Sequence, residues 1–499
     1  MIIFEDVQNS AITISFGQNR TIKVSGTTIL IVVLIVGGLL RFAALGRWSL
    51  WTDELYNLRL IPVSARLAEG VPADQHPPLY YLLLEQVLRL GRSEGLMRLP
   101  SALAGLLTIP IMWRVGVALK RPQLGLLATA LVAFAPLHIW YSREARMYSL
   151  AMFFWTTAIY FYIQSWQRDN WLDTLGLVLM MTGGLYTAYP TLALWFIQVA
   201  LFFLFWRLSR GRAGRLGRWA AAQLAIGALF YLWWPFLQRQ LERPIVFNWL
   251  NFFELVLGGQ TAAHLTQWLE QSGLTTTLVG TFQLALAVGL LFVLGSWLLS
   301  LLVVRRPSLI ALVKRWEFPI AVLITFLFLL FTAAGAVPRG LSLRRQLLVF
   351  WIPFLPLAAW ALLRLRDRWI PAVIVVMSLL LSLYTAFGLP YEDWRSTAVM
   401  ISEQGRPGDL ILVSPHWSTM AFDYYYEGDV SYQGATIQQV LTDEAALDNA
   451  RRVWLVVNRH PAIGGQTMEV EGWFLENGRV LMTYEYQQYL TVYEMVFGN

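Results

Sequence analysis

The chain has 499 residues, of which 57% are hydrophobic and only 14% are charged, whereas ordinary soluble domains carry about a quarter charged residues. This composition excludes an ordinary soluble protein and indicates a membrane protein. The formal net charge of +7 does not indicate a nucleic-acid partner, because the basic residues cluster in short loops between apolar runs. The chain contains no cysteine, which excludes disulfides, thiolate metal sites and cysteine nucleophiles.

Apolar runs recur from Thr28 almost to Leu389, and about 20 such residues suffice to cross a bilayer core of about 30 Å. The runs lack the alternation of barrel strands, so we expect an all-α polytopic membrane bundle. The first run follows no cleavable signal peptide and is expected to remain as an anchor. We predict about eleven spans, at 28–46, 97–118, 122–141, 147–166, 172–189, 191–208, 217–237, 277–304, 318–336, 347–364 and 370–389.

The basic residues predict the orientation of these spans in a cell (plasma or inner) membrane. With the N-terminus in the cytoplasm, the positive-inside rule is met at every cytoplasmic turn. The residues that meet it are Lys120, Arg121, Arg168, Arg207, Arg210, Arg212, Arg215, Arg218, Arg305, Arg306, Lys314, Arg315, Arg364, Arg366 and Arg368. The segment 76–90 is apolar but short and proline-led, so we expect an interfacial or re-entrant helix in the first outer loop. A span there would invert the charge pattern.

After Leu389 the sequence becomes mixed and charged. We therefore predict two domains: a transmembrane catalytic domain over 1–390 and a soluble extracytoplasmic α/β domain over 391–499. The pattern predicts a three-layer or flavodoxin-like unit. Its expected elements are a strand at 410–414, a helix at 437–450, a strand at 453–458 and a terminal pair at 479–485 and 489–496.

The first outer loop contains WTDELY, in which Asp53 and Glu54 stand between aromatic residues. An adjacent carboxylate pair can act as a base or bind a metal, although solvated loop acids are the commoner case. The same loop continues into HPPLYYLLL, where His76 and Tyr80 are candidate substrate contacts. His76 can bind a phosphate or a metal, but one histidine is a weak metal signal, and a hydrogen-bonded loop histidine is an equal alternative.

The second outer loop, SREARMYSL, places Arg143, Glu144, Arg146 and Tyr148 on the side where positive charge is disfavoured. Arginine there needs an anionic partner, and a phosphate suits it because the guanidinium fork matches phosphate oxygens. We predict that the two arginines and Tyr148 bind a donor phosphate and that Glu144 contacts substrate. The alternatives are an Arg143–Glu144 surface pair or arginines that reach lipid headgroups.

A third outer cluster, PRGLSLRRQLLVFWIP, adds Arg344 and Arg345 to the candidate phosphate contacts. Tyr186 and Tyr189, at the tight turn between the fifth and sixth spans, can supply aromatic walls for a sugar or prenyl chain. An interfacial aromatic belt is the stronger explanation for these two tyrosines.

These charges predict a mechanism for cleavage of a lipid-phosphate-linked sugar. The departing phosphate is a stabilised anion that needs cations more than a proton, so one base suffices. Asp53 is expected to deprotonate an acceptor hydroxyl in line with the leaving phosphate, which gives inversion. Glu54 is expected to orient the acceptor or the base. No cofactor is demanded, and the sequence leaves a divalent cation open.

The motifs WTDELYNL, HPPLYYLLL and SREARMYSL, in this order and spacing, resemble the polyprenyl- and dolichyl-phosphate-sugar transferases of the GT-C superfamily. Protein O-mannosyltransferases and lipid A aminoarabinose transferase are members of that group. The resemblance implies a GT-C bundle with interfacial helices, an extracytoplasmic site, Asp53 as base, and Arg143 and Arg146 near the donor phosphate. RRQLLVFWIP is similar to a late family motif, but Gln346 replaces its tyrosine, which leaves the choice between Arg344 and Arg345 open.

We therefore predict a glycosyltransferase that uses a polyprenyl-phosphate sugar donor among membrane lipids. Its acceptor is a lipid, protein or polysaccharide. A lipid-linked sugar flippase is the main alternative, but it should show mid-span charges and internal repeats, and neither is evident here. A scaffolding membrane protein would leave Asp53 and Glu54 without a purpose.

Overall fold

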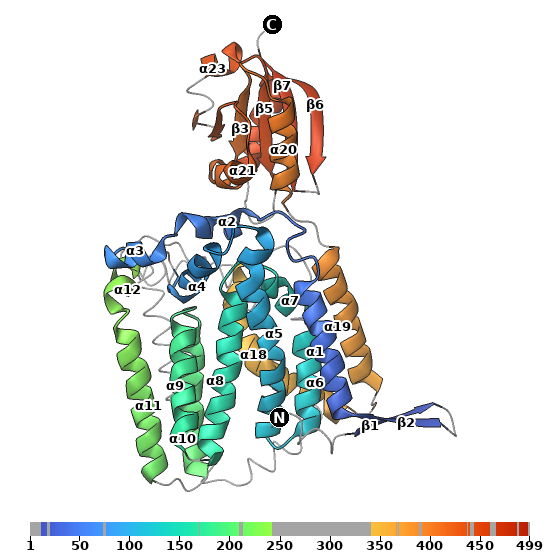
Figure 1. The fold of residues 1–499 in the computed structure, drawn as a ribbon, viewed down its shortest axis with the longest axis vertical. Helices are drawn as coiled ribbons and strands as arrows, with labels where there is room; N and C mark the ends of the chain where they lie inside the picture. Colours follow the sequence, from blue (N-terminus) through green and yellow to red (C-terminus); the bar gives the residue numbers. More distant parts are fainter. Residues whose placement is uncertain are drawn as a thin grey trace, which may run out of the picture.

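The structure is a computed structural model that divides into a helical bundle and a sheet domain stacked on one end of it (Figure 1). We call the end of the bundle that faces the sheet the domain end. The structure describes residues 11–16, 20–72, 76–168, 170–208, 213–241, 341–365, 367, 369–388, 392–436, 438–439, 444–459, 466–486 and 489–497.

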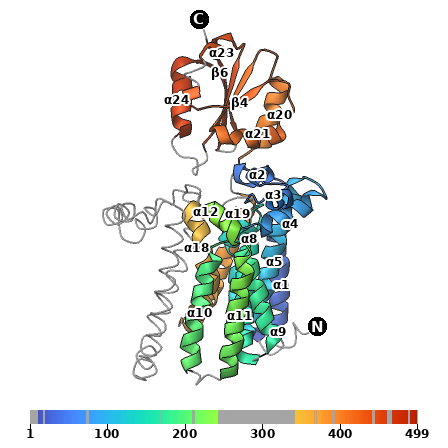
Figure 2. The same cartoon turned by 90° about the vertical axis from the view of Figure 1, so that its left-hand side faces the viewer.

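The bundle consists of long helices that run between the domain end and the opposite end (Figures 1 and 2). They are α1 (Gly26–Phe42), α5 (Glu94–Ala118), α8 (Tyr148–Arg168), α9 (Trp171–Leu185), α10 (Thr191–Leu208), α11 (Ala213–Tyr231), α18 (Leu341–Arg364) and α19 (Trp369–Phe387). Shorter helices continue or join them: α6 (Pro122–Ala133), α7 (Pro136–Ser142) and α12 (Trp234–Leu241).

The predicted spans outside 277–304 and 318–336 each coincide with a described helix or a bent helix pair. Two described helices, α5 and α19, are each long and apolar enough to cross a membrane. Counting the bent pairs α6–α7 and α11–α12 as single spans brings the number to four. The predicted spans 277–304 and 318–336 lie outside the described residues. The number of eleven spans therefore remains a prediction.

The bend of 57° between α6 and α7 is a local feature with a clear physical cause. Pro136 at the start of α7 cannot donate a backbone hydrogen bond, so the preceding carbonyls lose their helical partners. Arg41 donates to the carbonyls of Val132 and Ala133 at 3.3 and 3.1 Å, and Ser382 Oγ donates to that of Phe134 at 2.7 Å. Donors from α1 and α19 thus complete the hydrogen bonding of the break.

Glycines allow a close contact between α5 and α6. A Cβ added to Gly116 of α5 would lie 2.0 Å from the Cα of Gly125 in α6. No side chain fits at that distance, so the two backbones pack directly on each other, as small residues permit between membrane helices.

The first predicted outer loop forms three short helices at the domain end, between the bundle and the sheet domain, and the last of them falls within the predicted segment 76–90 (Figure 1). They are α2 (Thr52–Arg59), α3 (Val63–Ala68) and α4 (Leu79–Leu88). Glu85 of α4 accepts hydrogen bonds from the first two amides of α3, Val63 N at 3.0 Å and Ser64 N at 3.1 Å. A carboxylate at that position caps the helix and complements its dipole, so α3 and α4 form one unit.

The C-terminal domain is a three-layer unit, as predicted. The layers contain α20 (Trp394–Gln404), β3 (Leu410–Ser414), α21 (Thr419–Tyr425), β4 (Tyr432–Gly434), α23 (Glu444–Asn449), β5 (Val453–Asn458), α24 (Gln466–Asn477), β6 (Arg479–Tyr486) and β7 (Leu490–Val496). Figure 2 shows α20 and α21 on one side of the sheet and α24 on the other. Ile411 and Val413 of β3 join the core with α21, whereas Leu412 joins the core with α24, as strand alternation requires.

The flavodoxin-like alternative is wrong in its sheet. The strand order is β4-β3-β5-β7-β6, with β3 parallel to β4 and β5, but β7 is antiparallel to both β5 and β6. The predicted strands are confirmed, and the predicted helix 437–450 is present as α23 over its second half. Residues 437 and 440–443 of that prediction lie outside the described residues.

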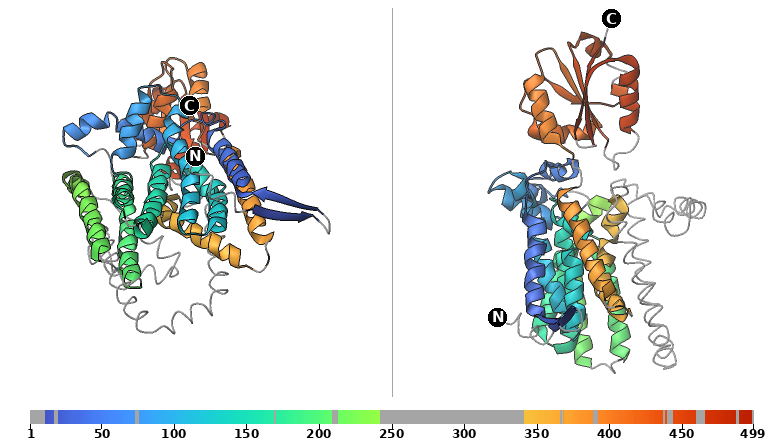
Figure 3. Two further views of the ribbon diagram at one scale, coloured as in Figure 1. Left: turned by 60° about the horizontal axis from the view of Figure 1, so that its bottom comes forward. Right: turned by 90° about the vertical axis from the view of Figure 1, so that its right-hand side faces the viewer.

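Sequence patterning missed several elements, among them β4 of the sheet domain and a two-stranded antiparallel hairpin before α1. The hairpin pairs β1 (Ala11–Phe16) with β2 (Arg20–Ser25) and projects from the end of the bundle away from the sheet domain (Figure 3). The side chain of Ser25 accepts a hydrogen bond from Thr28 N at 3.1 Å and begins α1 directly after the hairpin.

Candidate active site

The acidic pair lies in the first turn of α2 at the domain end, and its two members have different surroundings. Acidic residues in a first turn complement the positive end of a helix. Asp53 is half-buried, whereas Glu54 has no exposed surface. The two carboxylates look equivalent in the sequence, but they differ in burial in the structure.

Glu54 is held by Arg98 of α5 in a bidentate ion pair. Arg98 Nε lies 2.8 Å from Oε1 and Nη2 lies 2.6 Å from Oε2. The Ala145 amide donates to Oε1 at 2.7 Å and the Trp51 amide donates to Oε2 at 3.3 Å. Four donors therefore saturate both oxygens, which holds the Glu54 side chain in one position. This geometry suits a positioning carboxylate better than one that meets an acceptor.

Arg98 also gathers the loop that precedes α2. Its Nη1 donates to the carbonyls of Leu45 and Trp48 at 3.1 and 2.9 Å, and its Nη2 donates to that of Ser49 at 2.9 Å. Arg98 is only 1% exposed. Sequence reasoning missed this residue, although a charge in the first turn of a predicted span was a usable signal, since buried charges in membrane helices are costly and paired.

The predicted loop SREARMYSL docks onto α2 through Arg146 and the fully buried Asn57. Arg146 Nη1 donates to Asn57 Oδ1 at 2.9 Å and to the backbone carbonyl of Asp53 at 3.3 Å. Asn57 Nδ2 donates to the Ala145 carbonyl at 2.5 Å. Asn57 was not among the sequence candidates, because one asparagine in an amphipathic turn carries no distinctive pattern.

Arg146 is 6% exposed, yet its Nε makes no hydrogen bond in the part of the chain that the structure describes. Its hydrogen-bonded acceptors are neutral amide and carbonyl oxygens. Burial acts to lower its pKa, but Tyr81, Tyr148 and Asp53 outweigh that effect and hold the pKa well above its ordinary value. A buried, permanently charged guanidinium thus lies beside Asp53 with a donor to spare.

Arg143 serves a different place in the fold. Its Nη1 donates to the carbonyls of Leu40, Arg41 and Ala43 at 3.0, 3.3 and 2.8 Å, and its Nη2 to that of Ala44 at 3.3 Å. These carbonyls end α1, where cations are stabilising. Arg143 is 3% exposed and lies over the Phe387 ring at 5.4 Å. Helix capping accounts for Arg143 without a phosphate, so its predicted donor contact stays a prediction.

The other predicted contacts are spread over the domain end. Tyr80 is fully buried with its hydroxyl 3.0 Å from Ser101 Oγ. Tyr148 is 7% exposed with its ring 4.8 Å from that of Tyr141, and Glu144 is 4% exposed. The structure therefore buries these three groups within the packing around the second predicted outer loop.

His76 and Tyr189 meet through the interfacial helix α12. Gln240 Nε2 donates to the His76 carbonyl at 3.3 Å, and the Tyr189 hydroxyl donates to Gln240 Oε1. Trp233 Nε1 donates to the same hydroxyl at 2.8 Å. Arg344 and Arg345 belong to α18, but their side chains lie outside the described ones.

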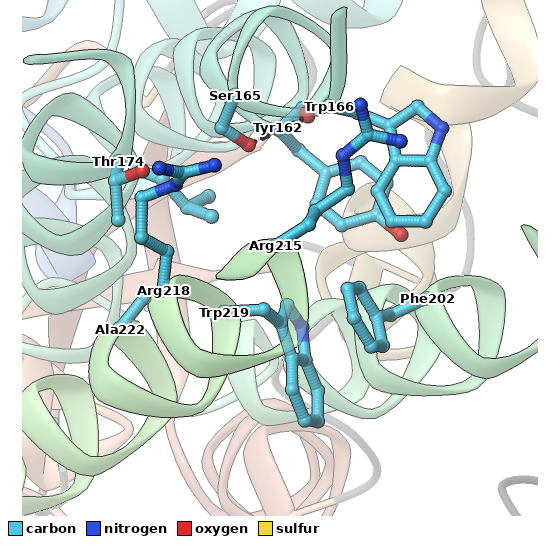
Figure 4. A pocket seen from close by; sticks show the side chains of 10 residues that line it. Tyr162, Ser165, Trp166, Thr174, Phe202, Arg215, Arg218, Trp219 and Ala222 are labelled. Carbon is cyan, nitrogen blue, oxygen red and sulfur yellow. Dashed lines mark hydrogen bonds between the residues drawn. The ribbon is translucent and has the colours of Figure 1, made fainter. Parts of the chain in front are cut away.

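Two further features bear on ligands. Within the described residues no group of three or more acidic or histidine side chains is arranged to hold a metal ion. A hollow lies between α8, α9, α10 and α11, and its lining includes Arg215, Arg218, Trp166, Phe202 and Trp219 (Figure 4). It includes none of the predicted site residues and lies toward the end of α8 remote from Asp53.

Comparison with known sequences identifies one family. Residues 75–234 match the family described as dolichyl-phosphate-mannose-protein mannosyltransferase. This segment contains Arg98, Arg143, Arg146 and Tyr148, and it begins after Asp53. No curated protein sequence matches the chain.

Comparison with solved structures finds matches at low sequence identity. The apo structure of ArnT from Cupriavidus metallidurans is 13% identical, with 94% of this chain and 98% of that chain covered and a TM-score of 0.47. The same protein bound to undecaprenyl phosphate is 14% identical, with the same coverage and a TM-score of 0.41. The Archaeoglobus fulgidus oligosaccharyltransferase complex with Zn and sulfate is 12% identical, with 93% and 72% covered and a TM-score of 0.49.

The family match covers about a third of the chain, and it falls on the segment that contains two of the three motifs singled out in the sequence. The predicted resemblance to the polyprenyl-phosphate-sugar transferases of the GT-C superfamily is thereby confirmed.

Proposed function

We propose that the protein transfers a sugar from a polyprenyl-phosphate-linked donor to an acceptor hydroxyl on the extracytoplasmic side of the membrane, with inversion at the anomeric carbon. The domain end then faces the extracytoplasmic side. The family match over 75–234 supports the donor class, and the positive-inside pattern of the loops supports the side.

The observation that carries this proposal is that Arg146 binds the helix α2 at the backbone carbonyl of Asp53. Arg146 is buried, bonded to neutral acceptors of α2, and has an Nε without a partner among the described groups. A phosphate oxygen is the acceptor that a dehydrated guanidinium binds best. The same helix presents the half-buried carboxylate of Asp53, so base and phosphate contact are fixed relative to each other.

This arrangement can perform the transfer with groups that the chain supplies. Asp53 accepts the proton of the acceptor hydroxyl as its oxygen attacks the anomeric carbon. The bond from that carbon to the phosphate oxygen breaks, and the departing phosphate keeps the electron pair as an anion that Arg146 stabilises. Attack opposite the leaving group inverts the configuration. Glu54 takes no proton and holds α2 through Arg98. Tyr148 and either Arg344 or Arg345 remain further proposed phosphate contacts.

The test uses purified protein in liposomes and a panel of radiolabelled polyprenyl-phosphate sugars. Wild type is expected to release or transfer one sugar, Asp53→Asn to bind that donor without turnover, and Arg146→Gln to bind it at least tenfold more weakly. Asp429→Asn is the matched control, because it makes the same chemical change at an exposed position of the C-terminal domain. Full turnover by Asp53→Asn would refute the base, and transport of intact donor without cleavage would favour the flippase.

A further inference from the structure

The start of α2 has an incomplete cap of its own. Glu54 accepts from the Trp51 amide at 3.3 Å, but Trp51, the residue before the helix, has no side-chain oxygen to accept the free amides of a helix start. α2 is also only eight residues long, and a helix this short is marginal without outside support. Whatever fixes the start of α2 also fixes the place of Asp53.

That support comes from the chain that leads into the C-terminal domain, 340 residues further on. Glu392 Oε2 accepts from Thr52 N at 3.2 Å and from Thr52 Oγ1 at 3.0 Å. The Glu392 carbonyl accepts from Ser49 Oγ at 2.5 Å, and Trp394 Nε1 donates to the same carboxylate at 2.6 Å. Glu392 is 2% exposed. Its charge lies at the positive end of α2, where it acts as an N-cap supplied from elsewhere.

A second contact comes from α21, which lies against α2 in Figure 1. The Tyr425 hydroxyl accepts from Leu50 N at 2.7 Å and donates to Glu94 Oε1 at 3.1 Å. Glu94 is the first residue of α5 and is also paired with Arg395 of α20. One hydroxyl thus ties the sheet domain to the loop before α2 and to the bundle.

We propose that the C-terminal domain positions the acidic end of α2 for the reaction, with Glu392 and Tyr425 as positioning residues that act through Asp53. This inference rests on the proposed transferase function. A displacement of about 1 Å at a reacting group can cost on the order of a hundredfold in rate. The domain holds three residues at the start of α2, namely Ser49, Leu50 and Thr52, and it therefore sets the turnover number without touching the donor.

The test compares two tyrosines that are neighbours on α21. Tyr425→Phe removes the bonds to Leu50 and Glu94 but keeps the ring. Tyr424→Phe is the matched control, since the Tyr424 hydroxyl donates to the Arg92 carbonyl at 2.6 Å instead of contacting Ser49, Leu50 or Thr52. We expect kcat to fall about five- to tenfold in Tyr425→Phe, as for loss of the hydrogen bond that holds the Leu50 amide, with donor Kd and melting temperature near those of Tyr424→Phe.

A second series varies the cap at Glu392. Glu392→Ala is expected to lower kcat more than Glu392→Gln, because glutamine keeps an oxygen that can accept from Thr52. Hydrogen exchange at the Leu50 and Thr52 amides should quicken in Tyr425→Phe and Glu392→Ala respectively. Equal kcat in Tyr425→Phe and Tyr424→Phe, with an active wild type, would overturn the positioning role alone. An inactive wild type across the donor panel would overturn the proposed function and this inference with it.

Discussion

Replacing Glu54 by glutamine tests whether this carboxylate stabilises the fold or reacts. The change keeps the size of the side chain but removes its charge, and it turns one oxygen into an NH₂ group that faces the donors of Arg98. Breaking a buried ion pair by changing one partner costs about 3–5 kcal/mol. Glutamine keeps one acceptor, and Arg98 keeps its three carbonyls, so we expect the lower value, about 3 kcal/mol.

That loss corresponds to a fall in melting temperature on the order of 3 °C for a chain of this size, because the entropy of unfolding grows with chain length. Thermal unfolding in detergent, followed by tryptophan fluorescence, measures it. Asp53→Asn removes the same charge one residue earlier at a half-buried position, and it is expected to shift the melting temperature by less than about 1 °C. Equal melting temperatures for Glu54→Gln and wild type would refute the reasoning, because a buried carboxylate with four donors cannot lose its charge without a loss of folding stability.

Three further substitutions test other contacts in the fold. Arg143→Gln is expected to lower the melting temperature while donor Kd stays unchanged, whereas a weakened donor Kd in equilibrium binding would instead assign it to phosphate. Ser64 and the two amides of α3 hold the pKa of Glu85 below its ordinary value of 4.5, so its contribution to stability is present above that pH and is lost as pH falls below it; Glu85→Gln should flatten acid unfolding curves there. Gly116→Ala should lower the free energy of unfolding by at least about 1–3 kcal/mol. Gly214→Ala should not, because open space surrounds Gly214. Equal melting temperatures for the two variants would contradict the close packing of α5 on α6.

The fold was predictable where the sequence carries a strong period. Apolar runs located the described bundle helices, and strands such as 453–458 stood out because parallel strands buried on both faces read as continuous apolar runs. The direction of β7 was not readable, since a strand sequence does not record which neighbour it pairs with. The hairpin before α1 was missed because a short amphipathic pair next to a long apolar run gives a weak signal.

For the candidate site, the sequence located the segments that carry the candidate residues, but it could not assign different roles to neighbouring residues within one segment. Asp53 and Glu54 differ in burial only because α2 turns one toward Arg98, and that rotation depends on contacts from α5. Arg143 and Arg146 look alike in SREARMYSL, yet one meets the carbonyls at the end of α1 and the other meets Asn57. The contact between Glu392 and α2 could not be predicted, because two residues 340 positions apart share no local sequence pattern.

The bend between α6 and α7 has a consequence for biosynthesis. Ser382, which satisfies the Phe134 carbonyl, follows it by 248 residues, so the ribosome must make most of the chain before that oxygen finds its partner. In hydrocarbon an unsatisfied carbonyl costs several kcal/mol. The bend between α6 and α7 is therefore expected to stay hydrated in the nascent bundle until α19 inserts. A chain that ends at residue 368 should expose the 132–135 stretch to protease, whereas the full chain should protect it; equal cleavage would show that α19 does not close the corner.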